Sequence, residues 1–319
     1  MASVGYNKQA SSLAHPSLNP VFGLEKIGHR GTQIIKAPNG YDVFVENTIP
    51  AFEKSARLGL DAVELDVILT KDGQLAVHHD DRTGRVFRLQ KPSLITETPW
   101  NHVKKATYNL GEFFNSTVLK KLPLTANAHL AGSLNDLRIP TLEEVVERTQ
   151  AINPNMHFYI EIKALNDGHM PEHFPAAGIP KLVAFIQKNK LHNNVTVISF
   201  NPFALEQIKA LDANINTGLN YTGTEPLRFK GEGANHSGKL PPFIPKRLMN
   251  YLKDIQINSF IPPFAEVTKR MVDQCHRAGL NIVPWVWHET RDQEAAEIER
   301  LKTLGVDGII SNNPDLLLK

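Results

Sequence analysis

The feature that most constrains the fold of this chain is a regular alternation of short apolar runs with helix-like segments. Residues 62–69, Ala-Val-Glu-Leu-Asp-Val-Ile-Leu, are typical of a β-strand. Residues 47–59 before them are typical of a helix, because Pro50 lies near the start and Gly59 at the end. Strands that alternate with helices form βαβ units, and such units build a parallel sheet.

The alternation continues to the end of the chain. Strands are predicted at residues 24–29, 62–69, 158–163, 195–199, 215–221, 255–258, 281–287 and 308–311. Helices are predicted at residues 47–59, 141–150, 180–189, 202–211, 245–253, 264–278 and 292–304. Eight parallel strands with helices between them indicate an α/β fold of the (β/α)8 barrel type. An open doubly wound sheet is the alternative, but no glycine-rich phosphate loop supports it.

The length of the chain fits one such barrel with additions. The chain has 319 residues, and a (β/α)8 barrel takes about 250. We expect a short N-terminal extension at residues 1–23 and one barrel domain at residues 24–319. Two segments interrupt the alternation: residues 82–138, an insertion after a hairpin that begins with the second strand, and residues 222–245, rich in Gly and Pro. Insertions of this length are functional loops and lids, or tolerated additions to the surface.

Composition excludes several classes of protein. A net charge of +2 and the lack of a dense Lys/Arg block argue against a nucleic-acid partner. Cys275 is the single cysteine, so an intramolecular disulfide is excluded, and we expect a packed side chain in a helix. The N-terminus lacks the apolar core of a signal peptide, and no apolar run approaches the ~20 residues of a membrane span. A cytoplasmic location is therefore expected.

Charged residues interrupt two strands that a barrel would bury. Glu64 and Asp66 are two residues apart, so their side chains share one face of the second strand. Glu161 and Lys163 share a face of the third strand in the same way. Buried charges are costly unless they are paired or bind a metal, and carboxylate oxygens suit Mg²⁺ or Ca²⁺. We expect a metal site at Glu64, Asp66 and Glu161; an ion-pair network around Lys163 is the alternative.

A hairpin after the second strand brings a histidine to the same place. Asp72-Gly73 between alternating apolar residues is typical of a two-residue hairpin turn. In that register Asp66 lies opposite His79, and directly opposed residues point to the same face. His79 is therefore expected beside the carboxylates, with His78 facing away. A register shifted by one residue would exchange the two histidines.

The first strand ends in Gly28-His29-Arg30-Gly31. Catalytic groups of (β/α)8 barrels lie at the C-terminal ends of the strands, so His29 is expected on the same rim as the three carboxylates. Two histidines beside a divalent cation can serve as general acid and general base. The guanidinium of Arg30 offers a fork of donors to a phosphate.

Further short motifs follow in a fixed order. They are Glu46-Asn47-Thr48, Ala51-Phe52, Thr70-Lys-Asp-Gly73, His79-Asp80, Ile139-Pro-Thr-Leu-Glu143, Ile160-Glu-Ile-Lys163, Ser199-Phe200, Trp285 and Asp307-Gly-Ile-Ile310. With His29-Arg30-Gly31 and Val63-Glu-Leu-Asp-Val67, this ordered set resembles the glycerophosphodiester phosphodiesterase family over nearly the whole chain. The family has the TIM-barrel fold and hydrolyses glycerophosphodiesters to glycerol 3-phosphate and an alcohol with a divalent cation.

The resemblance implies a role for each matching residue. Glu64, Asp66 and Glu161 would bind the metal, and His29 and His79 would form the acid–base pair. Arg30 and Lys163 would bind the phosphate, and Trp285 would line the pocket. Residues 82–138 stand where the family has an insertion that covers the site. The chain departs from the family in the added residues 32–45, which are expected to form a lid or shape the pocket. It also departs at His288 and Asn312, which stand where relatives often have Asn and Asp.

Other functions remain open at this stage. A lysophospholipase D that releases lysophosphatidic acid would need an apolar channel, for which Phe113, Phe114, Trp285 and Trp287 are candidates, although such aromatics are more often core residues. A phosphatidylinositol-specific phospholipase C is related in chemistry. A non-catalytic sensor of phosphate ligands is the non-enzyme alternative. The expected partner is a small-molecule substrate, with peripheral lipid contact if that substrate is a lysophospholipid.

Overall fold

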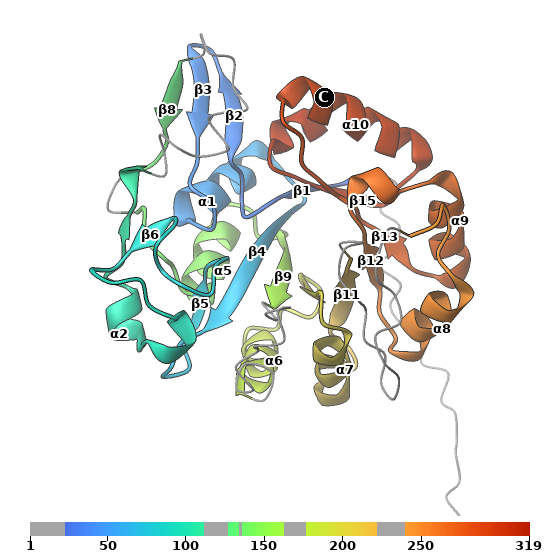
Figure 1. The fold of residues 1–319 in the computed structure, drawn as a ribbon, viewed down its shortest axis with the longest axis horizontal. Helices are drawn as coiled ribbons and strands as arrows, with labels where there is room; N and C mark the ends of the chain where they lie inside the picture. Colours follow the sequence, from blue (N-terminus) through green and yellow to red (C-terminus); the bar gives the residue numbers. More distant parts are fainter. Residues whose placement is uncertain (1–22, 112–126, 134–135, 163–176, 222–239) are drawn as a thin grey trace, which may run out of the picture.

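The computed structural model describes residues 23–111, 127–133, 136–162, 177–221 and 240–319, and its centre is a parallel sheet curled into a barrel (Figure 1). The barrel strands are β1 (Glu25–Gly28), β4 (Ala62–Leu69), β9 (His157–Ile162), β10 (Val195–Ser199), β11 (Asn216–Asn220), β12 (Ser259–Ile261), β13 (Asn281–Ile282), β14 (Trp285–Val286) and β15 (Gly308–Ser311). Their order in the sheet is β13-β12-β11-β10-β9-β4-β1-β15-β14, and the pairs between them are parallel.

The sheet closes on itself through one strand that is split in two. The two ends of the sheet order, β13 and β14, are consecutive in the chain. Trp285 of β14 pairs with Ile310 of β15 on one side and forms a parallel bridge to Pro263, just after β12, on the other. Pro284 has no N–H, which accounts for the break in the ladder. Counted as one, β13 and β14 give the eight strands of the predicted (β/α)8 barrel, and this fold class is confirmed.

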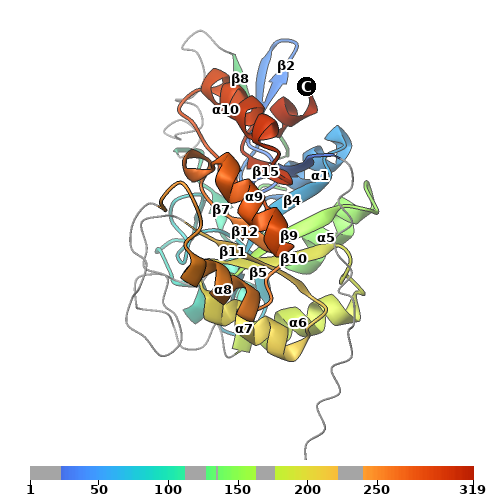
Figure 2. The same ribbon diagram turned by 90° about the vertical axis from the view of Figure 1, so that its right-hand side faces the viewer.

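Helices surround the barrel close to where the sequence predicts them. They are α1 (Ile49–Leu58), α5 (Leu142–Gln150), α6 (Ile179–Lys188), α7 (Pro202–Leu211), α8 (Lys246–Asp254), α9 (Lys269–Ala278) and α10 (Arg291–Leu304). Figure 2 shows α8 and α9 in front of β11 and β12, where Leu248, Met271 and the buried Cys275 belong to one apolar core with Phe260. The start of the predicted helix at 264–278 is instead a short 3₁₀ turn, η3 (Phe264–Glu266).

One predicted strand is wrong. Residues 255–258 form the connection after α8, where Gln256 has a left-handed φ of 55°, and the strand β12 begins only at Ser259. Ile255 and Ile257 are nevertheless buried, at 8% and 4% exposure. They pack into the same core as Leu252 of α8, so their apolar pattern reflects burial of the connection and not a strand.

The two faces of β4 divide as the sequence predicts. Val63, Leu65 and Val67 pack outward into a core with Phe52 of α1 and residues of α5. Because side chains alternate along a strand, Glu64 and Asp66 point to the barrel interior. The interior also holds an apolar layer that includes Ile27, Tyr159 and Ile310.

Two additional segments extend the barrel, one after strand β1 and one after strand β4. The added residues 32–45 form an antiparallel hairpin, β2 (Ile34–Ala37) with β3 (Gly40–Val43), which pairs with β8 (Ala128–Leu130) to make a separate sheet (Figure 1). Arg291 anchors this hairpin, because its guanidinium donates to the Ile34 carbonyl at 3.1 Å and to Asp315 at 2.7 Å.

A short strand and a small subdomain follow β4. Strand β5 (Leu75–Val77) pairs antiparallel with β4. After it come β6 (Phe87–Arg88), η1 (Ile95–Glu97), α2 (Trp100–Val103) and β7 (Thr107–Tyr108), which bury Val86, Phe87, Ile95 and Val103 in a small apolar core that also includes Ile68 of β4 and Ala76 of β5. Of the second predicted insertion, residues 222–239 lie outside the described residues. In the described part of the chain, no helix has the length and apolar character needed to cross a membrane.

Candidate active site

Three carboxylates meet at the C-terminal ends of two adjacent barrel strands. Glu64 and Asp66 belong to β4 and Glu161 to β9, with Asp66 and Glu161 in register. One ligand atom from each lies within 4.8 Å of the others. Their exposed fractions are 2%, 1% and 8%, respectively. Because alternate residues of each strand face inward, the two strands bring together the three residues that the sequence predicts as metal ligands.

The electrostatics of this cluster suit a divalent cation. Burial and the nearby charges of Asp66 and Glu161 raise the pKa of Glu64 well above its usual range. Oε1 of Glu64 is buried and has no hydrogen-bond partner among the described residues. Carboxylate oxygen atoms held close together are the ligands that hard cations such as Mg²⁺ and Ca²⁺ prefer. The residues present therefore fit a divalent metal.

Two asparagines hold the carboxylates in place. Nδ2 of Asn47 donates to Oδ2 of Asp66 at 2.7 Å, and the Asp66 amide donates back to Oδ1 of Asn47 at 3.3 Å. Nδ2 of Asn220, at the end of β11, donates to Oε2 of Glu161 at 3.0 Å. Hydrogen bonds of this kind hold carboxylates in the orientation that a metal site needs.

A tight turn after β1 brings His29 and Arg30 to the cluster. A Cβ on Gly28 would overlap the Gly31 carbonyl oxygen, and Gly31 itself has a φ of 85° and lies against the backbone of Ala51. Both positions therefore require glycine. The Arg30 amide donates to Oε2 of Glu64 at 2.9 Å, which attaches the turn to β4.

The guanidinium of Arg30 is held between acidic groups. Its Nη1 donates to Oε1 of Glu46 at 3.0 Å, and its Nε lies 3.3 Å from Oδ2 of Asp66. The charges of Glu46, Asp66 and Glu64 raise the pKa of Arg30 further above its ordinary value, against the opposing effect of burial. Arg30 thus places a fixed positive charge at the edge of the carboxylate cluster.

His29 lies between the cluster and Asn312. Its Nδ1 is 2.5 Å from Oδ1 of Asn312, and its Nε2 is 3.6 Å from Oε2 of Glu64. Burial and the charge of Arg30 lower the pKa of His29 to about 3. Because an amide oxygen only accepts, Nδ1 carries the proton and Nε2 offers its lone pair toward the cluster.

The predicted register of the hairpin is wrong by one residue. Val67 pairs with Val77 and Ile68 with Ala76, so His78, not His79, lies opposite Asp66. The turn has three residues instead of two, because Thr70 bonds to Gln74 through both its backbone and its hydroxyl. Gly73 has a φ of 85°, as expected for the last position of a three-residue hairpin turn.

His79 still approaches the site, but by another route. The chain leaves β5 after Val77, and His78 packs edge-on against Phe87 in the small apolar core. His79 remains partly exposed, with Nδ1 2.8 Å from Oδ1 of Asp80. The positive charges of Arg30 and Arg85 lower the pKa of Glu46 to about 2, despite its burial. Arg85 donates to both Asp80 and Glu46, so one guanidinium connects the partner of His79 to the carboxylate that holds Arg30.

The remaining predicted residues have different outcomes. Trp285 lies against the inner apolar layer, and its Nε1 is buried without a partner among the described residues. The ring of His288 packs at a tilt against that of Phe264, with ring centroids 4.5 Å apart. Lys163, Phe113 and Phe114 lie outside the described residues.

Sequence reasoning missed several residues that contact this set. Asn220 was predictable, because it lies at an inward-facing position of its strand, as the carboxylates do in theirs. Asn312 stood out only as a departure from the family, and the hydrogen bond to His29 gives it a place in the site. Asp80 and Arg85 gave no such signal, since their contacts depend on the path of the chain after β5.

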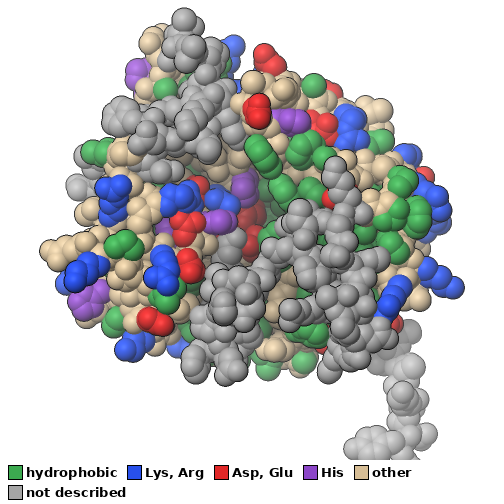
Figure 3. Space-filling view, viewed as in Figure 1, with side chains coloured by type: hydrophobic (Ala, Val, Ile, Leu, Met, Phe, Trp, Pro, Cys, Tyr) green, Lys and Arg blue, Asp and Glu red, His purple; other side chains and the backbone are tan. Residues whose placement is uncertain are grey.

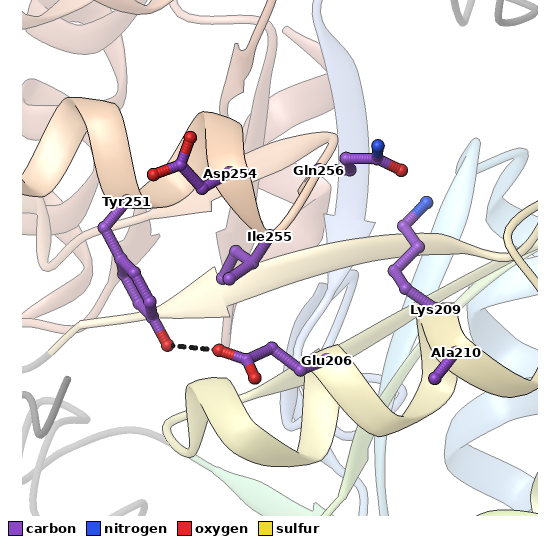
Figure 4. A pocket seen from close by; sticks show the side chains of 7 residues that line it. All are labelled: Glu206, Lys209, Ala210, Tyr251, Asp254, Ile255 and Gln256. Atoms are coloured by element: carbon purple, nitrogen blue, oxygen red, sulfur yellow. Dashed lines mark hydrogen bonds between the residues drawn. The ribbon is translucent and has the colours of Figure 1, made fainter. Parts of the chain in front are cut away.

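Figure 3 shows acidic, basic and histidine side chains gathered near the middle of one face, beside an apolar area. A cleft lies away from this set of residues, between α7 and α8, with a volume of about 570 Å³ (Figure 4). In that cleft Tyr251 donates to Glu206 at 2.8 Å. Nζ of Lys209 donates to the Ile215 carbonyl, to Asn258 and to the Ala213 carbonyl. Three bonds use all the donors of an ammonium group, so this lysine serves the fold.

A barrel with carboxylates, histidines and an arginine at the C-terminal ends of its strands belongs to the class of TIM-barrel proteins with an active site at that face. Comparison with protein families narrows the class. The model of the glycerophosphoryl diester phosphodiesterase family matches residues 29–316. The chain belongs to this family, and the resemblance in the sequence is confirmed.

Individual proteins that are similar to this chain are also phosphodiesterases. The chain is 28% identical over 276 residues to a glycerophosphodiester phosphodiesterase of Caldanaerobacter subterraneus, covering 86% of this chain and 90% of the relative. It is 27% identical over 299 residues to one from Bacillus subtilis, covering 92% and 85% of the two chains. An Oleispira antarctica phosphodiesterase solved in complex with the product sn-glycerol-3-phosphate has a similar fold, with a TM-score of 0.64, 19% identity and coverage of 92% and 96%.

Proposed function

We propose that this chain hydrolyses glycerophosphodiesters to glycerol 3-phosphate and an alcohol, with a divalent cation held by Glu64, Asp66 and Glu161. The observation that carries the proposal is the convergence of three buried carboxylates. One of their oxygen atoms has no partner in the described structure. Membership of the family supports the reaction, and the product bound to the Oleispira relative supports the substrate class.

The phosphate of the substrate would lie above the carboxylates. A cation bound there would neutralise the charge on the phosphate oxygens. Arg30 adds a guanidinium whose position is fixed by Glu46 and Asp66. Lys163 is proposed as a second cationic group from the residue that follows β9, and Trp285 would offer its buried Nε1–H to the substrate.

His29 and His79 are the proposed acid–base pair. One histidine would take a proton from the nucleophile, and the other would give a proton to the oxygen of the leaving alcohol. In His29 the proton on Nδ1 is held by Asn312, so Nε2 is the atom that exchanges a proton. Water as the nucleophile gives glycerol 3-phosphate directly, whereas the glycerol 2-hydroxyl gives a cyclic phosphate first.

The test compares glycerophosphocholine with lysophosphatidylcholine, each with EDTA, Mg²⁺ or Ca²⁺. Glycerol 3-phosphate and lysophosphatidic acid are detected separately. We expect glycerol 3-phosphate that depends on added cation. No product from either substrate with any cation would refute the proposal and favour the sensor of phosphate ligands.

One observation favours the lysophospholipase D as the second candidate. Trp287 is 51% exposed, two residues after Trp285 on the same segment, and apolar surface at a site of this kind suits an acyl chain. Lysophosphatidic acid as the sole product in the same assay would establish that function in place of the first.

A further inference from the structure

We propose that Arg85 is a positioning residue for His79, and that it acts through Asp80. The inference rests on the proposed function, because it concerns the acid–base pair of that reaction. It gives the subdomain after β5 a role in catalysis beyond that of a cover, since Arg85 lies just before β6 of that subdomain.

The first step is the clamp on Asp80. Nε of Arg85 donates to Oδ2 of Asp80 at 2.8 Å, and Nη2 donates to Oδ1 at 2.9 Å. This two-point contact fixes the plane of the carboxylate. Oδ1 also accepts from Nδ1 of His79 at 2.8 Å. With Nδ1 bound in this way, the ring of His79 is oriented and Nε2 is left for the substrate.

The second step is the connection to the metal ligands. Nη2 of Arg85 also donates to Oε1 of Glu46 at 2.6 Å, and the same oxygen atom accepts from Arg30 at 3.0 Å. Arg30 in turn lies 3.3 Å from Asp66. An unbroken series of charged contacts therefore runs from His79 to the carboxylate cluster, and Arg85 is its central member.

The third step is the fixed position of Arg85 itself. Its backbone carbonyl accepts from Nδ2 of Asn109 at 2.8 Å. The next two residues, Val86 and Phe87, are buried at 3% and 0% exposure. The backbone that carries the guanidinium is thus anchored in the small apolar core after β5.

A purely structural role predicts a different result. The side chain of Arg85 is 38% exposed, and ion pairs this exposed contribute little to stability. A misplacement of a catalytic group by about 1 Å, in contrast, lowers turnover on the order of 10²-fold. We therefore expect loss of Arg85 to affect kcat far more than the melting temperature.

The experiment is a double-mutant cycle on the full chain. Arg85→Gln, Arg85→Lys and the control Arg88→Gln, an exposed position in β6, are made in the wild-type and His79→Ala backgrounds. With glycerophosphocholine and the cation that supports wild-type turnover, Arg85→Gln should lower kcat roughly 10–100-fold. Its effect should fall below about threefold in the His79→Ala background. Arg85→Lys should restore part of kcat, and Arg88→Gln should match its parent chain.

Two results would overturn the inference. An equal loss in both backgrounds would mean that Arg85 acts independently of His79. A raised KM with unchanged kcat would mean that Arg85 binds the substrate.

A second measurement separates this inference from the proposed function. Nitrogen-15 NMR of the histidine rings should show the proton of His79 on Nδ1 in the wild-type chain and a mixture of tautomers in Arg85→Gln. An unchanged His79 signal would refute the role of Arg85. A wild-type chain without phosphodiesterase activity would refute the proposed function, while the NMR result would still decide whether Arg85 positions His79.

Discussion

The two ends of the barrel contain similar residues in opposite electrostatic situations. At the N-terminal end, Tyr159 donates to Glu25 at 2.6 Å, and His157 lies 2.9 Å from the Thr196 hydroxyl. Burial raises the pKa of Glu25 to about 7 and lowers that of His157 to about 4, so both groups favour their neutral forms. At the C-terminal end, three carboxylates lie together with one oxygen atom of Glu64 unpartnered in the described structure.

This difference indicates that the residues at the N-terminal end stabilise the fold, whereas those at the C-terminal end are arranged for chemistry. Neutral, paired groups close the N-terminal end at little electrostatic cost. The carboxylates of the C-terminal end repel one another, and such local cost is typical of functional sites. Substitutions at the two ends should therefore have effects of different kinds.

The largest expected effect is the loss of either histidine of the proposed acid–base pair at the C-terminal end. His29→Ala and His79→Ala should each lower kcat by on the order of 10²–10⁴, the usual contribution of general acid–base catalysis. Steady-state kinetics with glycerophosphocholine measure the effect. His276→Ala is the control, because His276 is exposed and pairs with Asp307 at the opposite end. Near-normal turnover in both active-site variants would refute the assignment.

Much of this fold could be predicted because its determinants are local. The limits of β4, β10 and α7 follow from apolar runs bounded by turn residues, and the inward face of β4 follows from parity alone. The register of the β4–β5 hairpin could not be predicted from Asp72-Gly73, because the hydroxyl of Thr70 selects a three-residue turn.

The candidate site also contains residues that local sequence patterns predict and residues that they do not. The alternation of side chains along a strand predicts Glu64, Asp66 and Glu161, and it also indicates Asn220 at the end of β11. Arg85 could not be found in this way, since it reaches Glu46, 39 residues away in sequence, through the fold of the intervening subdomain. Local patterns thus predict the three carboxylates of the cluster better than the groups that orient the side chains of the site.

The next effect concerns the orientation of Glu161, a proposed metal ligand. Asn220→Leu removes the donor to Glu161 and should weaken cation binding by about 10–100-fold, as losses of such supporting contacts usually do. Isothermal titration with the cation alone measures it. Thr196→Val, which removes the partner of His157 at the other end, is the matched control. Equal cation affinity in Asn220→Leu and the wild type would contradict the prediction.

A smaller effect of opposite sign is expected for stability. Glu64→Gln removes one of three repelling carboxylates and keeps an oxygen atom that can accept from the Arg30 amide. In EDTA the variant should be more stable by about 1–2 kcal/mol, since a neutral group is buried at lower cost. It should also lose the rise in melting temperature that the cation gives the wild type. Calorimetry with and without cation checks both, and a less stable variant in EDTA would show that the repulsion is already compensated.

A stability effect of similar size tests the N-terminal end through pH. The pKa of Glu25 rises from 4.5 to about 7 on folding, so the folded state keeps a proton that the unfolded state loses within this window. Its contribution to stability is complete below pH 4.5 and is lost as the pH rises through 7. Glu25→Gln cannot ionise and can still accept from Tyr159. Relative to the wild type it should gain on the order of 1–3 kcal/mol across this window.

His157 supplies the matched control for that measurement, because its shift has the opposite sign. Its pKa falls from 6.5 to about 4 on folding, so its contribution to stability is complete above pH 6.5 and is lost as the pH falls through 4. Relative to the wild type, His157→Gln should therefore become less stable as the pH rises from 4 to 6.5, while Glu25→Gln becomes more stable over the overlapping range. Denaturant unfolding at a series of pH values measures both differences. Parallel curves for the wild type and Glu25→Gln would mean that Glu25 ionises as freely in the folded barrel as in the unfolded chain, and the two ends of the barrel would then both carry charge.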